Sequence, residues 1–476
     1  MIDWAKPVDL HISLEGRGDR TDRIYRQLRD AILDGRLRPG ERVPPSRELA
    51  RDLSVARNTV AAAYDRLVGD GFLAGRSGAG TFVSYGGSPA LSRRAPAGPL
   101  RPTPRFLGIP PDASPTPGAR LDLRIGHPDA SLFPLATWRR LLARSVRASA
   151  EYDDPAGLPP LRAAVARHIG LSRSVRAAPA DVLITAGAQQ GLDLVARVLV
   201  EPGAVVAVEE PGYRPARRLF GSHGARVAGV PVDADGIVVD RIPAAARLVY
   251  VTPSHQHPLG TAMSLPRRTA LLAWAQEHGA AIVEDDYDSE FRYSDRPLEP
   301  LQSLDRTGRV IYVGSFSKTL LPSLRLGFLV APEALRPALR TARALADWHG
   351  EPAAQAALAA FIDEGLLRRH LRKVGRVYAA RHDLVVKAAA GPLAPWFAPV
   401  PSSAGLHLAL RCTGPVDVGA LVRALRAAEV AVEPLSHFYA SPADDPGLAI
   451  GFGAIATADL PAALDRLTDT AAALSR

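Results

Sequence analysis

One lysine in this sequence is well placed to do chemistry, because it follows a short apolar run. Residues 310–313 read Val-Ile-Tyr-Val, which is typical of a buried strand, and Lys318 comes next on a turn of small residues. A lysine presented in this way can form a Schiff base with an aldehyde cofactor. The hydroxyls of Ser315 and Ser317 and the cation of Arg325 could hold a phosphate group of that cofactor.

Three other segments place polar or aromatic groups after predicted strands. An acidic run with Asp285 and Tyr287 follows the predicted strand 281–283, residues 185–190 join a strand to a helix, and Tyr213 follows a Pro-Gly turn. Singly, each has an ordinary explanation, such as a solvated turn or a packed ring. Ligands of open α/β sheets bind at the carboxyl ends of strands. Together the segments therefore predict a pyridoxal phosphate site, with a lysine, a ring-nitrogen carboxylate, a phosphate cradle and a covering ring.

The elements that must position these groups form a long alternating region from residue 121 to the end. Predicted strands at 182–185, 205–208, 248–251, 281–283, 310–313 and 328–330 alternate with predicted helices at 189–200, 265–278 and 336–348. This alternation predicts an α/β fold with a mostly parallel sheet and helices on both faces.

The first part of the chain follows a different pattern. Residues 12–85 predict a helix capped by Thr21, a short helix capped by Ser46, a third helix over about 56–69, and a strand–turn–strand wing. A short turn between two helices, with polar residues at the start of the second, predicts a helix-turn-helix that reads DNA. The candidate DNA contacts are Arg47, Arg57, Asn58, Thr59, Arg76 and Gly80.

Composition separates these two regions and excludes some classes of protein. Residues 86–120 contain nine prolines, and residues 91–120 carry five arginines against one aspartate, so we expect a basic, semi-rigid linker. The 476 residues have a net charge of +9 and one cysteine, Cys412, which suits a reducing cytoplasm and excludes a disulfide framework. We find no signal peptide, no membrane span and no metal-binding motif.

The N-terminal region resembles a GntR-type winged helix-turn-helix. Residues 39–50 read Pro-Gly-Glu-Arg-Val-Pro-Pro-Ser-Arg-Glu-Leu-Ala, and 57–60 and 80–83 continue the resemblance. At Ala56 this family often has a serine that caps the recognition helix. Loss of such a cap costs about 1 kcal/mol, which concerns stability more than DNA binding.

From residue 121 onward the chain resembles the fold-type I aminotransferases of class I and II, with a smaller C-terminal α+β subdomain. The resemblance implies that Lys318 holds pyridoxal 5'-phosphate as an internal aldimine. It implies roles for other residues as follows: Asp285 at the pyridine nitrogen, Tyr287 at the phenolic oxygen, Tyr213 on the ring, Ala188, Gln189, Ser315, Ser317 and Arg325 at the phosphate, and Tyr152 at the neighbouring subunit's phosphate.

Two positions depart from the aminotransferase pattern. His257 stands where the enzymes carry an asparagine, and it can still hydrogen-bond the phenolic oxygen. Ala449 falls where the enzymes carry an arginine for the substrate carboxylate, and alanine cannot bind that group. Another arginine, such as Arg214, could replace it.

The whole arrangement resembles the MocR-type, GabR-like transcriptional regulators. This resemblance implies a homodimer, often head-to-tail, that binds a double-stranded DNA operator and responds to pyridoxal phosphate or to an amine or amino-acid effector. Vitamin B6 or amino-compound metabolism would be the regulated process. Two alternatives stay open: an active aminotransferase with a DNA-binding appendage, and a DNA-binding protein whose body serves only as a dimer scaffold.

Overall fold

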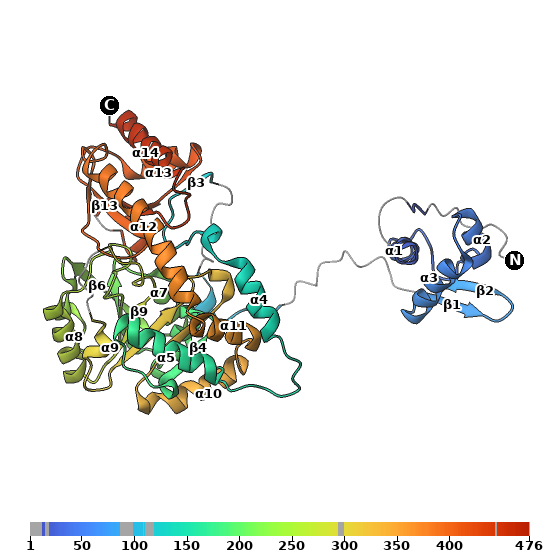
Figure 1. Cartoon of the computed structure of the whole chain (residues 1–476), viewed down its shortest axis with the longest axis horizontal. Helices are drawn as coiled ribbons and strands as arrows, with labels where there is room; N and C mark the ends of the chain where they lie inside the picture. Colours follow the sequence, from blue (N-terminus) through green and yellow to red (C-terminus); the bar gives the residue numbers. More distant parts are fainter. Residues whose placement is uncertain are drawn as a thin grey trace. The chain divides into compact units, whose positions relative to one another are not determined.

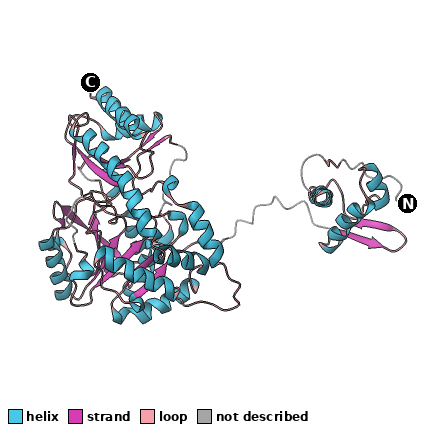
Figure 2. Ribbon diagram, viewed as in Figure 1, coloured by secondary structure: helices cyan, strands magenta, loops and turns pink. Residues whose placement is uncertain are grey.

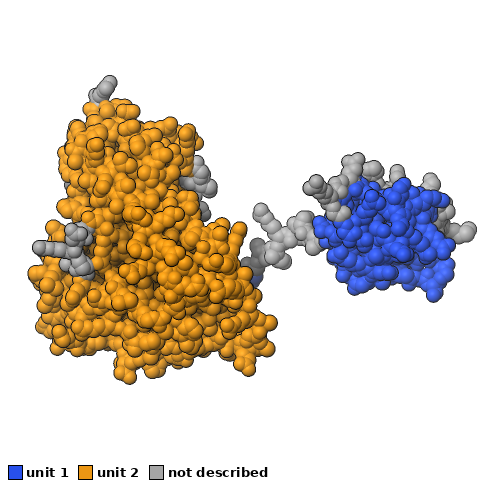
Figure 3. Space-filling view, in the orientation of Figure 1, with its two compact units in different colours: residues 1–101 blue, residues 102–476 orange. Residues whose placement is uncertain are grey.

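Two compact units make up the chain, Met1–Arg101 and Pro102–Arg476 (Figures 1 and 3). The computed structural model describes residues 12–14, 19–85, 99–107, 109, 119–293, 299–442 and 445–475. Most of the predicted linker 86–120 lies outside these described residues, so its boundaries stay a prediction.

Unit 1 contains three helices, α1 (Arg20–Leu33), α2 (Ser46–Asp52) and α3 (Arg57–Gly69). They surround a core of their own that includes Ile24, Leu28, Val60 and Leu67. Two capping predictions are wrong. The cap of α1 is Asp19, whose carboxylate accepts the N–H of Thr21, and Ser46 lies inside α2, because the preceding Pro45 takes the cap position. The expected lack of a side-chain cap at Ala56 is confirmed for α3.

A small antiparallel wing completes unit 1. Its strands β1 (Leu73–Arg76) and β2 (Gly80–Val83) pair so that Arg76 lies opposite Gly80. The predicted strand–turn–strand wing is present, and its first strand carries Arg76 at its end. Residues 41–43 join the other edge of β2, since the N–H of Val43 donates to the carbonyl of Thr81 at 3.0 Å. The wing is therefore fixed to the turn before α2.

Unit 2 is built on an eight-stranded sheet in the order β4-β11-β10-β9-β8-β5-β6-β7. Its strands lie among helices in the ribbon view (Figure 2). The strands are β4 (Val182–Thr185), β5 (Val205–Glu210), β6 (Arg226–Asp233), β7 (Gly236–Ile237), β8 (Ala246–Val251), β9 (Ala281–Asp286), β10 (Val310–Ser315) and β11 (Gly327–Val330). Strands β10, β9, β8, β5 and β6 are mutually parallel, whereas β11 and β7 run antiparallel to their neighbours. The predicted mostly parallel sheet is confirmed, and each predicted strand is present.

Helices cover both faces of this sheet because its central strands are apolar on both sides. In β10, Ile311 and Val313 face one helical layer, whereas Tyr312 faces the other. The first layer contains α6 (Ala188–Leu199), α7 (Arg214–Ser222) and α10 (Arg336–Asp347). The second contains α4 (Leu135–Ser145), α5 (Pro159–Arg173), α8 (Leu265–Glu277) and α11 (Pro352–Asp363), and the short helix α9 (Leu301–Leu304) packs beside α8.

The C-terminal part of unit 2 forms a separate lobe, as the resemblance to aminotransferases implied. Its sheet has the order β12 (Phe397–Pro399), β13 (His407–Cys412), β16 (Gly447–Gly451) and β15 (Glu433–Pro434). The helices α13 (Val418–Ala427), α14 (Leu460–Leu474) and the long α12 (Leu366–Ala390) pack against it, and α12 also contacts α11 of the large lobe (Figure 1).

The first strand of unit 2 belongs to this lobe, although it lies far away in sequence. Strand β3 (Leu121–Asp122) pairs in parallel with β14 (Val430–Ala431), and Leu121 and Leu123 enter the lobe's core. The chain then runs from the lobe toward the large sheet through Gly126. No helix among the described residues is long and apolar enough to cross a membrane.

Candidate functional site

The predicted site residues meet at one edge of the large sheet. Parallel strands end at the same edge, so the loops after β4, β5, β8, β9 and β10 converge there. Strand β11 runs in the opposite direction, which brings its amino end to this edge, with Gly327 opposite Thr185 of β4. Arg325, two residues before β11, therefore lies beside the loop after β4 although the two segments are distant in sequence.

Lys318 lies on the turn after β10, as predicted. Its Nζ donates to the carbonyl oxygen of Gly126 at 2.5 Å, a contact between segments 192 residues apart. Burial lowers the pKa of Lys318, against the opposing effect of the Asp288 and Asp285 carboxylates. A lowered pKa increases the fraction of neutral amine, which is the form that attacks an aldehyde.

Asp285 is buried at the end of β9 with one oxygen engaged and one free. The Tyr250 hydroxyl donates to Oδ2 at 2.7 Å, whereas Oδ1 has no hydrogen-bond partner among the described residues. Burial raises the pKa of Asp285 to about 7, against the opposing effect of the Tyr250 bond. A buried acceptor without a partner is costly unless a donor arrives, so Oδ1 fits the protonated nitrogen of a pyridine ring.

Three rings line the space beside these groups. The centroids of Tyr213 and His257 are 5.3 Å apart, and those of His257 and Tyr287 are 5.8 Å apart. Burial and the nearby Lys318 cation lower the pKa of His257 to about 3, so this imidazole is neutral at pH 7. Its Nδ1 is buried and has no partner in the described part of the chain. A neutral imidazole with a free nitrogen suits a hydrogen bond to a phenolic oxygen.

Tyr287 is turned toward the protein in this structure. Its hydroxyl lies 3.0 Å from the carbonyl oxygen and 3.1 Å from Nδ1 of His255. Burial, and next the Asp288 carboxylate, raise the pKa of Tyr287 well above its usual value. The side chain thus stays protonated beside the site, and its predicted contact with a cofactor oxygen stays a prediction.

The predicted phosphate cradle is assembled from the start of α6 and from Arg325. Ala188 is the first residue of α6 and Gln189 the second, and the cap residue Gly187 has a φ of 89°. A Cβ on Gly187 would lie 3.1 Å from two guanidinium nitrogens of Arg325, which also donates to the Ala186 carbonyl. On the neighbouring turn, the Ser315 hydroxyl accepts the N–H of Ser317 at 3.1 Å. A helix start and a guanidinium that face each other suit a phosphate.

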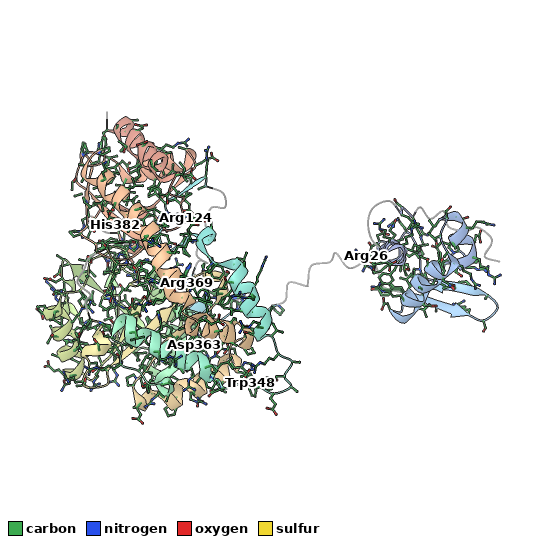
Figure 4. The ribbon with its side chains drawn as sticks, viewed as in Figure 1. Arg26, Arg124, Trp348, Asp363, Arg369 and His382 are labelled. Atoms are coloured by element: carbon green, nitrogen blue, oxygen red, sulfur yellow. The ribbon has the colours of Figure 1, made fainter. Side chains whose placement is uncertain are left out.

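Tyr152 is the one predicted cofactor residue that the structure does not bring to this site within the chain. Its side chain is 72% exposed, and its ring stacks on Trp348 at 4.7 Å between centroids. Trp348 lies at the end of α10 with a φ of 64° and is itself 60% exposed (Figure 4). The two rings form an exposed aromatic pair.

Sequence reasoning missed several residues that support the site. The Thr252 hydroxyl donates to the buried Glu209 at 2.6 Å, and His255 Nδ1 lies 3.0 Å from an oxygen of Asp288. These contacts join residues more than 30 positions apart, so no local pattern shows them. Glu209 and Asp288 belong to the same acidic segments as the predicted site residues Tyr213 and Asp285. Their acidic side chains are the sequence signal that could have identified them.

The predicted DNA contacts gather around α3 and the wing. Arg47, Arg57 and Asn58 are exposed, and Thr59 is half-buried on the first turn of α3. The side chains of Arg47 and Arg57 make no hydrogen bond or ion pair with another described residue, so both guanidinium groups are available for a ligand. Arg76 lies over the Phe82 ring at 4.8 Å.

The structure adds Arg42 to this set. Gly80 has a φ of 113°, and a Cβ there would lie 2.7 Å from Nε of Arg42. The exposed Arg42 side chain therefore crosses the wing strand beside Arg76. The sequence placed Arg42 in a turn and gave no sign of this contact with the wing.

The buried carboxyls make the cofactor-free protein sensitive to pH. Asp285 deprotonates near 3.8 in an unfolded chain and near 7 when folded, so folding becomes less favourable as pH rises between these values. We expect Asp285→Asn to stabilise the cofactor-free protein by about 2 to 4 kcal/mol at pH 8 and by little at pH 4. Urea unfolding at both pH values checks this. The exposed Asp240→Asn should show no such difference, and an equal gain at both pH values would contradict the cause.

Comparison with known proteins supports the two-part organisation. The family model "Aminotransferase class I and II" matches residues 121–467, and the model "Bacterial regulatory proteins, gntR family" matches residues 20–83. Among solved structures, the α-aminoadipate aminotransferase LysN of Thermus thermophilus, complexed with N-(5'-phosphopyridoxyl)-L-leucine, has a TM-score of 0.68 and 31% identity, over 75% of this chain and 93% of that one.

Two curated relatives extend over nearly the whole chain. The probable rhizopine catabolism regulatory protein MocR of Rhizobium meliloti is 39% identical over 452 residues, which cover 91% of this chain and 90% of that protein. The pyridoxine biosynthesis transcriptional regulator PdxR of Corynebacterium glutamicum is 34% identical, over 90% of this chain and 91% of its own length. This chain therefore belongs to the MocR-type transcriptional regulators, which join a GntR-type DNA-binding domain to an aminotransferase class I and II domain.

Proposed function

We propose that this protein is a pyridoxal phosphate-dependent transcriptional regulator that senses pyridoxal phosphate or an amine through Lys318. One observation carries the proposal: a DNA-reading fold and a cofactor-type site occur in the same chain. The winged helix-turn-helix presents Arg47 and Arg57, whose side chains have no partner among the described residues. In unit 2, a buried Asp285 oxygen without a described partner lies beside the buried Lys318. The MocR and PdxR relatives are both regulatory proteins and support the same assignment. Since a DNA operator would be its binding partner, the proposed site of action is the cytoplasm.

The site's own residues would each make a distinct contribution to cofactor binding. When bound, pyridoxal phosphate supplies an aldehyde that condenses with amines and a ring that withdraws electrons. Asp285 would hold the ring nitrogen, and the neutral His257 would hydrogen-bond the phenolic oxygen. Arg325 and the start of α6 would bind the phosphate. Lys318 would hold the aldehyde, and burial, which lowers its pKa, would increase the fraction of its amine in the neutral, nucleophilic form.

Lys318→Ala should abolish covalent cofactor binding. The wild-type protein, loaded with pyridoxal phosphate and desalted, is expected to keep a visible absorbance band that the variant loses completely. The exposed Lys373→Ala is a matched control that should retain the band. If the wild type saturated with pyridoxal phosphate shows no band, the aminotransferase-like domain serves only as a dimer scaffold and the proposal is wrong.

Turnover separates a regulator from an aminotransferase with a DNA-binding appendage. The relatives with this two-part organisation are regulators, but the body shares the fold of working aminotransferases. We propose that the protein is not a functioning enzyme. Sustained amino transfer to a 2-oxo acid, at a rate typical of aminotransferases, would favour the enzyme instead.

Arg57→Ala should weaken operator binding by about 1 to 3 kcal/mol, because Arg57 lies exposed on the first turn of the recognition helix. The probe is a duplex selected by the full-length protein from a random pool, and binding is measured by fluorescence anisotropy at several salt concentrations. Arg36→Ala removes the same charge from unit 1, but its guanidinium is paired with Asp34 at 2.8 Å. Equal losses in both variants would show that only net charge matters.

A homodimer would give the exposed Tyr152–Trp348 pair a role. We propose that this pair reaches the neighbouring subunit's phosphate site, where Tyr152 would add a hydroxyl to the cradle of Arg325 and α6. A large exposed stacked pair is unusual for a surface that stays in water. In sedimentation velocity, the wild type should be dimeric and Trp348→Ala should weaken the dimer and its affinity for pyridoxal phosphate. A dimer and cofactor affinity unaffected by Trp348→Ala would contradict this role.

A further inference from the structure

A row of three side chains in the C-terminal lobe faces the Lys318 site. In the lobe's antiparallel sheet, Ala449 of β16 lies opposite Ala409 of β13 on one side and Glu433 of β15 on the other. Directly opposed residues of antiparallel strands place their side chains on the same face of a sheet. Ala409 and Ala449 are both fully buried, with 0% exposure. The row therefore reads methyl, methyl, carboxylate.

This row belongs to the same site as Lys318. Ala409 and Ala449 pack in an apolar cluster that includes Ile125 and Phe438. Ile125 immediately precedes Gly126, whose carbonyl accepts from Lys318. The Phe438 ring lies 5.2 Å from the His257 ring, which in turn contacts Tyr213. The cluster thus continues directly from the rings that would surround the cofactor.

The wall formed by this cluster carries no excess of positive charge within the described residues. Arg124 donates to both oxygens of Asp122, at 2.8 and 2.6 Å, and lies where the small lobe meets the rest of unit 2 (Figure 4). Glu433 accepts the N–H of Ile125 at 3.1 Å. The Arg124 and Arg214 cations lower the pKa of Glu433, whereas its burial raises it more strongly. The acidic groups Asp122 and Glu433 therefore lie beside the Arg124 and Arg214 cations.

Two histidines near the wall, His257 and His407, add no positive charge to it. Burial lowers the pKa of His257 to about 3, and it lowers the pKa of His407 well below its usual value. Both rings are neutral at pH 7. A donor group of an effector that reaches this row of side chains would thus meet Glu433, which lies opposite Ala449.

An α-amino acid would fit this wall poorly. With its amino group at the cofactor, its carboxylate would be buried against the Ala449 methyl group, and a buried anion needs a partner. It would also lie near Glu433, a like charge. A hydroxyl or a second amino group on the effector would instead donate a hydrogen bond to the Glu433 carboxylate.

We propose that the effector of this regulator is a primary amine without a neighbouring carboxylate, whose hydroxyl or second amino group donates to Glu433. The inference rests on the proposed function, because it places the effector at the cofactor held by Lys318. It names the class of ligand that the cofactor site accepts.

L-alaninol and L-alanine test the inference, because they differ only in a CH2OH group in place of the carboxylate. Each is titrated into the pyridoxal phosphate-loaded full-length protein after desalting, and the shift of the cofactor band is followed. We expect L-alaninol to reach half-saturation at a concentration at least tenfold lower than L-alanine. Equal or tighter binding of L-alanine would overturn the inference.

Variants separate the role of Glu433 from the shape of the site. Glu433→Gln keeps the size of the side chain and should reduce the tenfold preference to less than about threefold. The exposed Glu429→Gln in the same lobe should leave the preference unchanged. Ala449→Arg should reverse the preference, and Ala449→Lys serves if that variant fails to fold. A preference that survives in Glu433→Gln would overturn the role of this carboxylate.

Two further outcomes separate this inference from the proposed function. If the cofactor band forms but neither amine shifts it, the effector inference is wrong and the cofactor site stands. If no band forms in the saturated wild type, the proposed function itself is wrong. Tight L-alanine binding that Arg214→Gln abolishes would assign a carboxylate anchor to Arg214 and overturn the inference.

Discussion

The site depends on a carboxyl group that the large sheet holds out of water. Asp285 lies near the end of β9, which has a parallel neighbour on each side, and helices cover both faces of the sheet. The Tyr250 hydroxyl from the adjacent strand satisfies one oxygen and leaves the other without a partner among the described residues. Such a group destabilises the folded chain above its unfolded pKa, unless a cation or a donor is brought to it. A protonated ring nitrogen would offset this cost, so cofactor binding and folding of the body are linked.

The direction of one strand determines how the phosphate groups meet. A purely parallel sheet would have brought the carboxyl end of β11 to this edge and carried Arg325 to the opposite one. Because β11 is antiparallel, Arg325 enters the edge beside Gly187, and Gly327 approaches the Cα of Gly187 so closely that a Cβ would lie 2.8 Å from it. Small residues at both positions are therefore a packing requirement of the cradle.

The sequence predicted the groups at the strand ends, because each follows a recognisable strand or opens a helix. It predicted the alternating fold for the same reason, since an apolar run of three or four residues between helical segments is a local signal. The antiparallel direction of β11, the Lys318–Gly126 contact and the pairing of β3 with β14 join distant segments, and no local pattern records them. The predicted helix caps Thr21 and Ser46 are wrong, because Asp19 and Pro45 occupy the two cap positions. The resemblance to known families, rather than periodicity, supplied the individual roles at the site.

The row of Ala409, Ala449 and Glu433 in the C-terminal lobe suggests why this aminotransferase-like domain would sense a ligand rather than turn over an amino acid. Exchange of one amine for another at Lys318 needs only access and a neutral attacking amine. Turnover of an α-amino acid also needs its Cα–H bond held in a fixed orientation, and that orientation requires a second anchor for the substrate. Ala449 provides no such anchor for a carboxylate, and Glu433 repels one. Such a wall would hinder catalysis on amino acids more than it would hinder amine binding, which is the event that the proposed regulator would detect.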